Sequence, residues 1–161
     1  MGDPSEFIKV IQELASQSTC WLGVGCLAVK DGRIIAQAYN EVLPDPQICN
    51  KDGCLRKKKN LSGGEGVEDC FAIHAEVNLI AKAARAGLSL EGVDIYVTCF
   101  PCAVCAKALV QAGVARVFYL EDFLGRKGEV YFSELNTPPV RVRDEVLSTK
   151  SGSPQARRKR G

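Results

Sequence analysis

Two short motifs constrain the fold of this chain more than any other feature, because both must meet at one point. They are His74-Ala75-Glu76 and Pro101-Cys102-Ala103-Val104-Cys105. Helical spacing of apolar residues over 70–87 predicts a helix with His74 in its first turn and Gly87 as its cap. Residues 93–98 are typical of a strand, and Pro101 is expected to begin a helix that runs to Gly113. The fold must therefore bring two helix starts together across one strand.

The side chains at these helix starts are those that bind zinc. One imidazole and two thiolates give three protein ligands, from His74, Cys102 and Cys105, and leave a fourth tetrahedral position for water. Helix N-termini favour the thiolate form that a metal needs. Glu76, two residues after the histidine, is placed to take a proton from that water. An H-x-E motif followed by P-C-x-x-C is the signature of zinc-dependent hydrolytic deamination.

Other interpretations of these motifs are less consistent with the sequence. A Cys-x-x-Cys pair alone also occurs in redox dithiols and in structural zinc ribbons. Here, however, the single histidine of the chain lies two residues before a glutamate. A closed structural site would need a fourth protein ligand. Cys99 is the nearest candidate. It lies in the predicted strand, however, and the chain turns between Cys99 and Cys102, so the two side chains should not point to the same metal.

The remaining pattern predicts a layered α/β fold. Pro4 is expected to be the first residue of a helix that ends near Ser18. A β-prone run over 22–30, the turn Asp31-Gly32 and a second run over 33–39 predict an antiparallel hairpin. A strand over 115–121 would be parallel to that over 93–98. With a fifth strand or an amphipathic turn over 140–146, we expect a mixed sheet of about five strands with helices on both faces.

The sequence also predicts the domain organisation. We expect one domain over residues 1–147, with a short helix within 123–135, followed by a disordered basic tail over 148–161. The net charge of +2 gives no strong argument for a nucleic acid or a membrane surface as partner. No apolar run approaches the ~20 residues of a membrane span. Because we expect a cytoplasmic protein, its eight cysteines are interpreted as thiols and metal ligands, not disulfides.

Residues 40–69 lack periodicity and form a predicted loop that is longer than most connections in compact domains. Its basic run, Arg56-Lys57-Lys58-Lys59, is interpreted either as a phosphate contact or as a solvated charge run. Cys49, Cys54 and Cys70 lie in this loop or at its exit. They suggest a second, structural zinc ion with a fourth ligand such as Cys20. The competing interpretation is that these cysteines are small buried side chains, which are common in protein interiors.

From Gly23 to about Tyr119, the chain resembles the cytidine and deoxycytidylate deaminase superfamily, and most of all its deoxycytidylate (dCMP) deaminase branch. Phe100 stands where transfer-RNA adenosine and guanine deaminases carry glutamate, and His74 differs from the cysteine of free-nucleoside cytidine deaminases. Val77, in place of a glutamine common in the branch, departs from the pattern. The other matching segments are Val24-Gly25-Cys26, 31–35, Tyr39-Asn40, Gly53-Cys54-Leu55-Arg56, Ser62-Gly63, Cys70, 73–76 with Asn78, 96–102 and Cys105-Ala106-Lys107.

The resemblance implies a cytidine deaminase-like fold with three layers and a homo-oligomeric enzyme that acts on a small cytosine nucleotide. It implies that Asn40 contacts the sugar or base and that the backbone around Ala75 contacts the pyrimidine carbonyl. With Arg56 or a neighbouring lysine on the phosphate, the leading hypothesis is conversion of dCMP to dUMP with release of ammonia. The rivals are a deaminase of another free cytosine compound, a deaminase of RNA or single-stranded DNA, and a non-catalytic zinc-binding subunit.

Overall fold

The structure is a computed structural model that describes most of the chain. The described residues are 4–43, 45–49, 52–61, 65–122, 126–135 and 138–142. The basic tail predicted over 148–161 lies outside them. In these described parts, no helix has both the length and the apolarity needed to cross a membrane.

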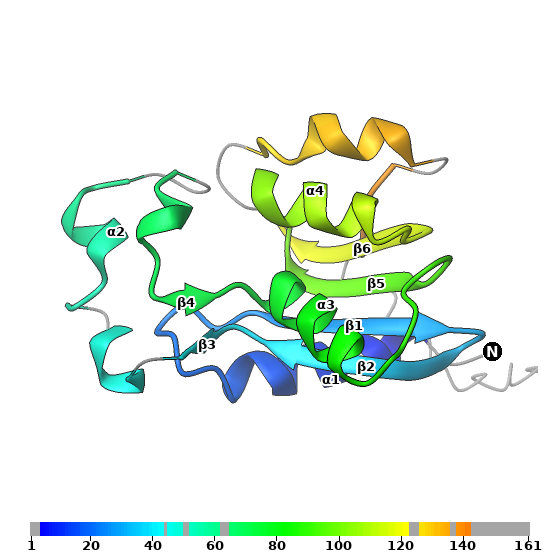
Figure 1. Ribbon diagram of the computed structural model, residues 1–161, viewed down its shortest axis with the longest axis horizontal. Helices are drawn as coiled ribbons and strands as arrows, with labels where there is room; N and C mark the ends of the chain where they lie inside the picture. Colours follow the sequence, from blue (N-terminus) through cyan, green and yellow to red (C-terminus); the bar gives the residue numbers. More distant parts are fainter. Residues whose placement is uncertain are drawn as a thin grey trace, which may run out of the picture.

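A five-stranded mixed sheet forms the centre of the molecule (Figure 1), as predicted. Its strand order is β2-β1-β5-β6-β7. The first three strands in this order are antiparallel, whereas β5, β6 and β7 are parallel. Their bounds are Gly25–Lys30 (β1), Arg33–Tyr39 (β2), Asp94–Cys99 (β5), Arg116–Glu121 (β6) and Val140–Arg141 (β7). The fifth strand predicted within 140–146 is therefore present as β7, beside β6.

The hairpin of β1 and β2 has the predicted turn. Asp31 and Gly32 have φ angles of 51° and 74°, and this left-handed pair matches the right-handed twist of the two strands. β1 begins at Gly25 and not at Leu22 as predicted. A side chain at Gly25 would collide with the Ile11 carbonyl oxygen, so glycine permits the close approach of the first helix.

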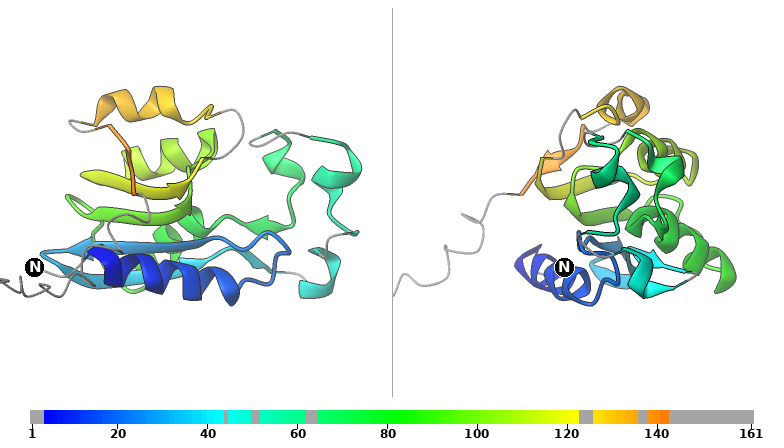
Figure 2. Two further views of the ribbon diagram at one scale, coloured as in Figure 1. Left: turned by 180° about the vertical axis from the view of Figure 1, so that it is seen from behind. Right: turned by 90° about the vertical axis from the view of Figure 1, so that its left-hand side faces the viewer.

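Helices cover both faces of the sheet, which gives the three layers expected from the sequence. α1 (Pro4–Ser16) packs on one face through Phe7, Ile11 and Leu14. α3 (Ala75–Arg85) and α4 (Ala103–Gln111) cover the opposite face, and the two views of Figure 2 show α1 on the side away from them. Successive side chains of β1 point to opposite faces of the sheet. Leu27 and Val29 therefore face α1, whereas Cys26 and Ala28 face the core on the other side.

Both motif helices begin later than predicted. The helix expected from residue 70 begins at Ala75, because Ala72–Ile73 form a strand (β4) that pairs with β3 (Glu41–Val42). Pro101 is not the first residue of α4, which begins at Ala103. His74 and Cys102 are the N-cap residues of their helices, each with extended backbone angles.

The region predicted as a long loop between β2 and β4 contains three short helices: η1 (Pro46–Cys49), α2 (Leu55–Lys58) and η2 (Val67–Asp69). They project together from one end of the sheet, at the left in Figure 1. We call the segment from Leu43 to Asp69 the excursion. The short helix predicted within 123–135 is η3 (Glu129–Glu134), which packs against α4.

Candidate active site

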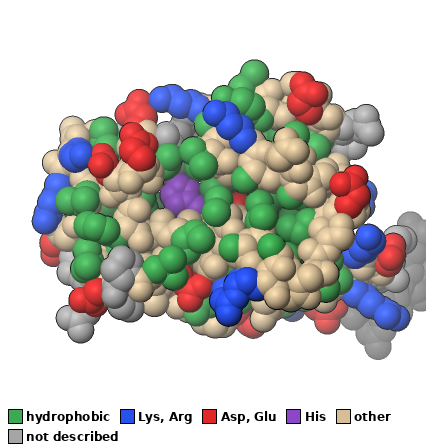
Figure 3. Space-filling view, in the orientation of Figure 1, with side chains coloured by type: hydrophobic (Ala, Val, Ile, Leu, Met, Phe, Trp, Pro, Cys, Tyr) green, Lys and Arg blue, Asp and Glu red, His purple; other side chains and the backbone are tan. Residues whose placement is uncertain are grey.

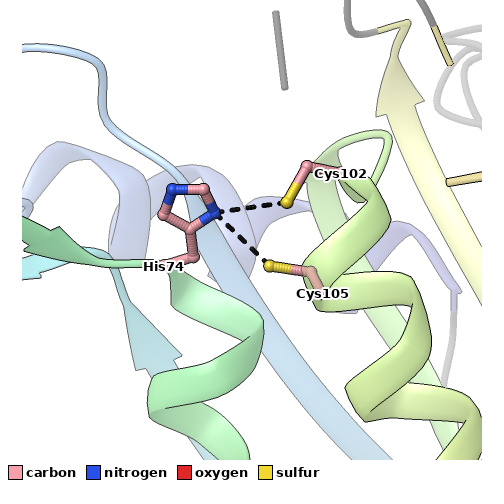
Figure 4. Close-up of side chains that lie close together, drawn as sticks. All are labelled: His74, Cys102 and Cys105. Atoms are coloured by element: carbon pink, nitrogen blue, oxygen red, sulfur yellow. Dashed lines mark hydrogen bonds between the residues drawn. The ribbon is translucent and has the colours of Figure 1, made fainter. Parts of the chain in front are cut away.

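Three potential metal ligands meet at the carboxyl end of β5. α3 leads into this strand and α4 follows it, so the N-termini of both helices lie at the same end of the strand. His74 Nδ1 lies 3.5 Å from Cys102 Sγ and 3.4 Å from Cys105 Sγ (Figure 4). All three ligand atoms lie within 4.8 Å of one another, and among the described residues no other group of three or more such ligands is as compact. His74, Cys102 and Cys105 therefore form a candidate zinc site.

The chemistry of the three donors fits zinc. A hydrogen bond with the Cys105 thiol, together with the imidazole of His74, lowers the pKa of Cys102 to about 4, so Cys102 is a thiolate at neutral pH. Contacts with the sulfurs of Cys102 and Cys70 raise the pKa of His74 to about 10. The neighbouring Cys102 and burial raise the pKa of Cys105. Because His74 and Cys105 must release protons to bind a metal, metal affinity should fall with acidity.

Glu76 is the second residue of α3 and is buried, with 4% of its surface exposed. Burial raises the pKa of its carboxyl, and the His74 charge opposes that shift. A buried carboxyl with a raised pKa is suited to accept and return a proton near neutral pH. The carboxyl also interacts with Cys105. The candidate zinc site therefore has an acid–base group beside it, which a purely structural site would not need.

A pocket opens onto this cluster and brings together residues from five parts of the chain. It is lined by the predicted site residues Asn40, Arg56, His74, Ala75, Glu76 and Cys102. Cys105 is fully buried and does not line this pocket. From the side shown in Figure 3, the only histidine of the sequence is visible among hydrophobic side chains. The site can thus combine a metal, a buried acid and a cationic side chain around one ligand.

Asn40 is buried and its side chain is largely occupied by the chain itself. Its Oδ1 accepts hydrogen bonds from the Val24 backbone N–H (2.7 Å) and the Ser18 hydroxyl (2.6 Å). Its Nδ2 donates to the Leu22 carbonyl oxygen over 2.7 Å. The backbone of Asn40 is not in the left-handed region, which asparagine often adopts in turns. Asn40 is therefore not a turn residue of that kind. These bonds fix the segment between α1 and β1, which contributes Leu22 and Val24 to the pocket.

The structure separates the four residues of the basic run. Arg56 lines the pocket, and its Nε donates to the Glu65 carbonyl oxygen over 2.9 Å. Lys59 forms an ion pair with Asp69 (2.6 Å), and the Lys57 ammonium lies 6.0 Å from the centre of the Trp21 ring. Lys58 is exposed. Of this run, Arg56 is thus the residue placed at the pocket.

Several residues that line the pocket were not predicted to do so from the sequence. Leu22, Val24 and Phe100 provide apolar walls, and Cys20, Cys70, Ala72 and Cys99 complete the lining. Cys70 interacts with the His74 imidazole. The sequence identified Cys70 only as a candidate ligand of a second zinc ion and as part of the family resemblance, and did not place it beside His74. Apolar wall residues resemble any core residue in a sequence, so no signal distinguished them.

Comparisons with known proteins agree with this site. The family model described as "Cytidine and deoxycytidylate deaminase zinc-binding region" matches residues 1–121. The deoxycytidylate deaminase of Enterobacteria phage T4 is 51% identical over 151 residues, covering 74% of this chain and 78% of that protein. ComE operon protein 2 of Bacillus subtilis is 38% identical over 125 residues, covering 76% of this chain and 59% of that protein.

Other relatives are longer, and a solved structure shares the fold. The deoxycytidylate deaminase of Schizosaccharomyces pombe is 32% identical over 116 residues, covering 71% of this chain and 36% of that protein. The chain spans between 36% and 59% of the length of four relatives that it matches. The dCMP deaminase of cyanophage S-TIM5 has a TM-score of 0.62 and 23% identity, covering 86% of this chain and 94% of that chain.

Proposed function

The chain belongs to the cytidine and deoxycytidylate deaminase family, and on this basis we propose that it is a zinc-dependent hydrolase that converts dCMP to dUMP. In this reaction water adds to C4 of the cytosine ring, the bond from C4 to the amino group breaks, and ammonia leaves. One observation carries the proposal: buried Glu76 lies beside the three-ligand cluster in a pocket that also contains Arg56. Relatives named deoxycytidylate deaminase support the same substrate class.

In the proposed mechanism, His74, Cys102 and Cys105 would hold a zinc ion, which would supply Lewis-acid activation of water. The Glu76 carboxylate takes a proton from the attacking water. As a carboxylic acid it then gives this proton to the ring nitrogen N3. In a second transfer Glu76 takes the proton of the hydroxyl group added at C4 and passes it to the departing amine, so that the C4 carbonyl forms as ammonia leaves. The buried position of Glu76 favours this exchange, because burial disfavours a permanent carboxylate charge.

The base would be held by backbone and apolar groups. Ala75 is the first residue of α3, so its N–H has no partner within the helix and is available to the pyrimidine carbonyl. Phe100, Leu22 and Val24 line the pocket and provide apolar surfaces for the ring. Asn40 would act mainly as a positioning residue, because its amide already holds the segment that carries Leu22 and Val24.

The test of this function is a substrate panel. Ammonia release would be measured with dCMP, dCTP, deoxycytidine, cytosine and short single-stranded oligonucleotides at two salt concentrations. We expect the highest kcat/KM for dCMP and a modest effect of salt. A preference for oligonucleotides with a steep loss of activity at high salt would instead identify a polynucleotide deaminase. No ammonia from any cytosine compound would identify a non-catalytic zinc-binding protein.

Replacing Arg56 with alanine should raise KM for dCMP and leave deoxycytidine turnover nearly unchanged. A hydrogen bond to a charged group contributes about 1.5–3 kcal/mol, so the expected loss in kcat/KM for dCMP is roughly 10- to 100-fold. Lys58→Ala is the matched control, because Lys58 belongs to the same basic run, is exposed and does not line the pocket. An equal loss on the nucleotide and the nucleoside would show that Arg56 supports the fold of the pocket and does not bind phosphate.

A further inference from the structure

Asn78 is a buried polar residue that the proposed mechanism does not use. Only 6% of its surface is exposed, and it is the fourth residue of α3, two positions after Glu76. Its backbone N–H donates to the His74 carbonyl oxygen over 2.8 Å, so it belongs to the same helical turn as that candidate ligand. Asn78 does not line the pocket. Any effect of Asn78 on the reaction must therefore pass through other residues.

The side-chain amide of Asn78 donates to the segment that contains Asn40. Its Nδ2 lies 2.8 Å from the Tyr39 carbonyl oxygen and 2.6 Å from Glu41 Oε2. These two acceptors belong to the residues on either side of Asn40. An amide NH2 group has two hydrogens, so both are used. Because one acceptor is a carboxylate, that bond is stronger than one between neutral groups. Asn78 therefore ties α3 to residues 39–41.

Glu41 is held by two further contacts. Lys82 Nζ donates to the same carboxylate oxygen over 2.9 Å. Hydrogen bonds from Lys82 and Asn78 lower the pKa of Glu41, so it accepts both bonds as a carboxylate at neutral pH. Its backbone pairs with Ile73 in the ladder of β3 and β4, where β3 leads into the excursion and β4 follows it (Figure 1). Ile73 is the residue before His74, so Glu41 is fixed beside the start of α3.

Residues 39–41 also determine the position of one wall of the pocket. The Asn40 amide accepts from the Val24 N–H and donates to the Leu22 carbonyl oxygen, and both of these residues line the pocket. A series of hydrogen bonds thus runs from α3, through Asn78 and residues 39–41, to this apolar wall. α3 also packs against β2, but apolar contact is not directional. Short hydrogen bonds depend on distance and angle, so they define where the wall lies relative to α3.

We propose that Asn78 is a positioning residue for the deamination. Through Asn40, it holds the wall formed by Leu22 and Val24 at a fixed distance from Glu76 and the candidate metal ligands. This role rests on the proposed function, in which that wall holds the pyrimidine ring at the reacting groups. The wall contacts the base and not the phosphate. Loss of the Asn78 hydrogen bonds should therefore impair the nucleotide and the nucleoside equally.

Asn78→Asp tests this role, because aspartate has nearly the same shape but cannot donate to Tyr39 and repels the Glu41 carboxylate. We expect kcat/KM to fall roughly 10- to 100-fold for dCMP and for deoxycytidine alike, since a displacement of about 1 Å can cost about 10²-fold. Arg56→Ala, in contrast, should affect dCMP alone. Ammonia release would be normalised to folded, zinc-loaded protein, measured by circular dichroism and elemental analysis. A loss of stability alone would then leave the normalised value unchanged.

The double variant Asn78→Asp/Glu41→Gln exchanges the donor and the acceptor. The glutamine introduced at position 41 can donate to the aspartate introduced at position 78, which restores one of the two bonds. We expect kcat/KM to rise roughly fivefold above that of Asn78→Asp, because residues in contact are energetically coupled. Asn60→Asp is the matched control, because Asn60 is exposed and does not line the pocket. It should keep kcat/KM within about twofold of the parent value.

Asn78→Ala provides a second measurement if the aspartate variant does not fold, because it removes the same two bonds without adding a charge. The positioning role is overturned if folded Asn78→Ala keeps kcat/KM within about twofold of the parent value for both substrates. A loss confined to dCMP, or no recovery in the double variant, would also overturn it. In each of these cases an active parent chain leaves the proposed function standing. A parent chain that releases ammonia from neither substrate would overturn both, since the positioning role requires the reaction.

Discussion

Glu76→Gln is expected to lower kcat for dCMP by on the order of 10³-fold, because a general acid–base group contributes about 10²- to 10⁴-fold. Glutamine has nearly the same shape as glutamate but cannot accept and return the proton. Zinc content should remain equal to that of the parent chain, since Glu76 is not among the three clustered ligands. The measurements are ammonia release at saturating dCMP and elemental analysis of the same sample.

The thermal midpoint of Glu76→Gln separates a catalytic role from a structural one. Glu76 is buried and its pKa is raised, so its replacement by a neutral side chain removes a charge that the folded state disfavours. We expect the variant to be at least as stable as the parent. Glu13→Gln, on the exposed surface of α1, serves as the matched control for charge. If Glu76→Gln kept its zinc and its turnover, proton transfer would have to be assigned to another group.

Cys105→Ala is expected to remove the catalytic zinc and with it all measurable turnover. Cys105 is fully buried and its sulfur lies 3.4 Å from His74 Nδ1, so its removal leaves the cluster with two of its three ligands. Two remaining ligands bind zinc far more weakly than three. Because the metal joins the starts of α3 and α4, the free energy of unfolding should fall as well. Elemental analysis should show one zinc ion fewer per chain, and a thermal melt should show the lower midpoint.

The matched control for this variant is Cys26→Ala. Cys26 and Cys105 are both fully buried, and each substitution removes one sulfur atom, so the two variants lose the same side-chain volume from the interior. Any loss of stability common to both variants therefore reports packing. Any additional loss of stability in Cys105→Ala reflects the loss of the bound metal. Equal zinc content in Cys105→Ala and the parent would show that Cys105 is not a ligand.

Much of the fold was predictable because its signals are local. The turn at Asp31-Gly32 needs two residues that accept left-handed angles, and the chain has them where the strands on each side require them. The alternation of helices and strands predicted the mixed sheet and its three layers. The predicted starts of the helices were less accurate. Residues 72–73 are compatible with a helix, but they are held as β4 by hydrogen bonds to β3, which lies thirty residues away in the chain.

The candidate site also has features that the sequence predicts and features that only the structure shows. The sequence alone pointed to His74, Cys102 and Cys105 as candidate zinc ligands and to Glu76 as the candidate acid–base residue, because the proposed chemistry requires each of these side chains and each lies near the start of a predicted helix. Only the tertiary structure decided which basic residue reaches the pocket, which atoms hold the Asn40 amide, and that Cys20 lies against Cys49. These contacts join residues far apart in the chain. Local propensity carries no information on such distances, which are fixed when the sheet and its helices pack.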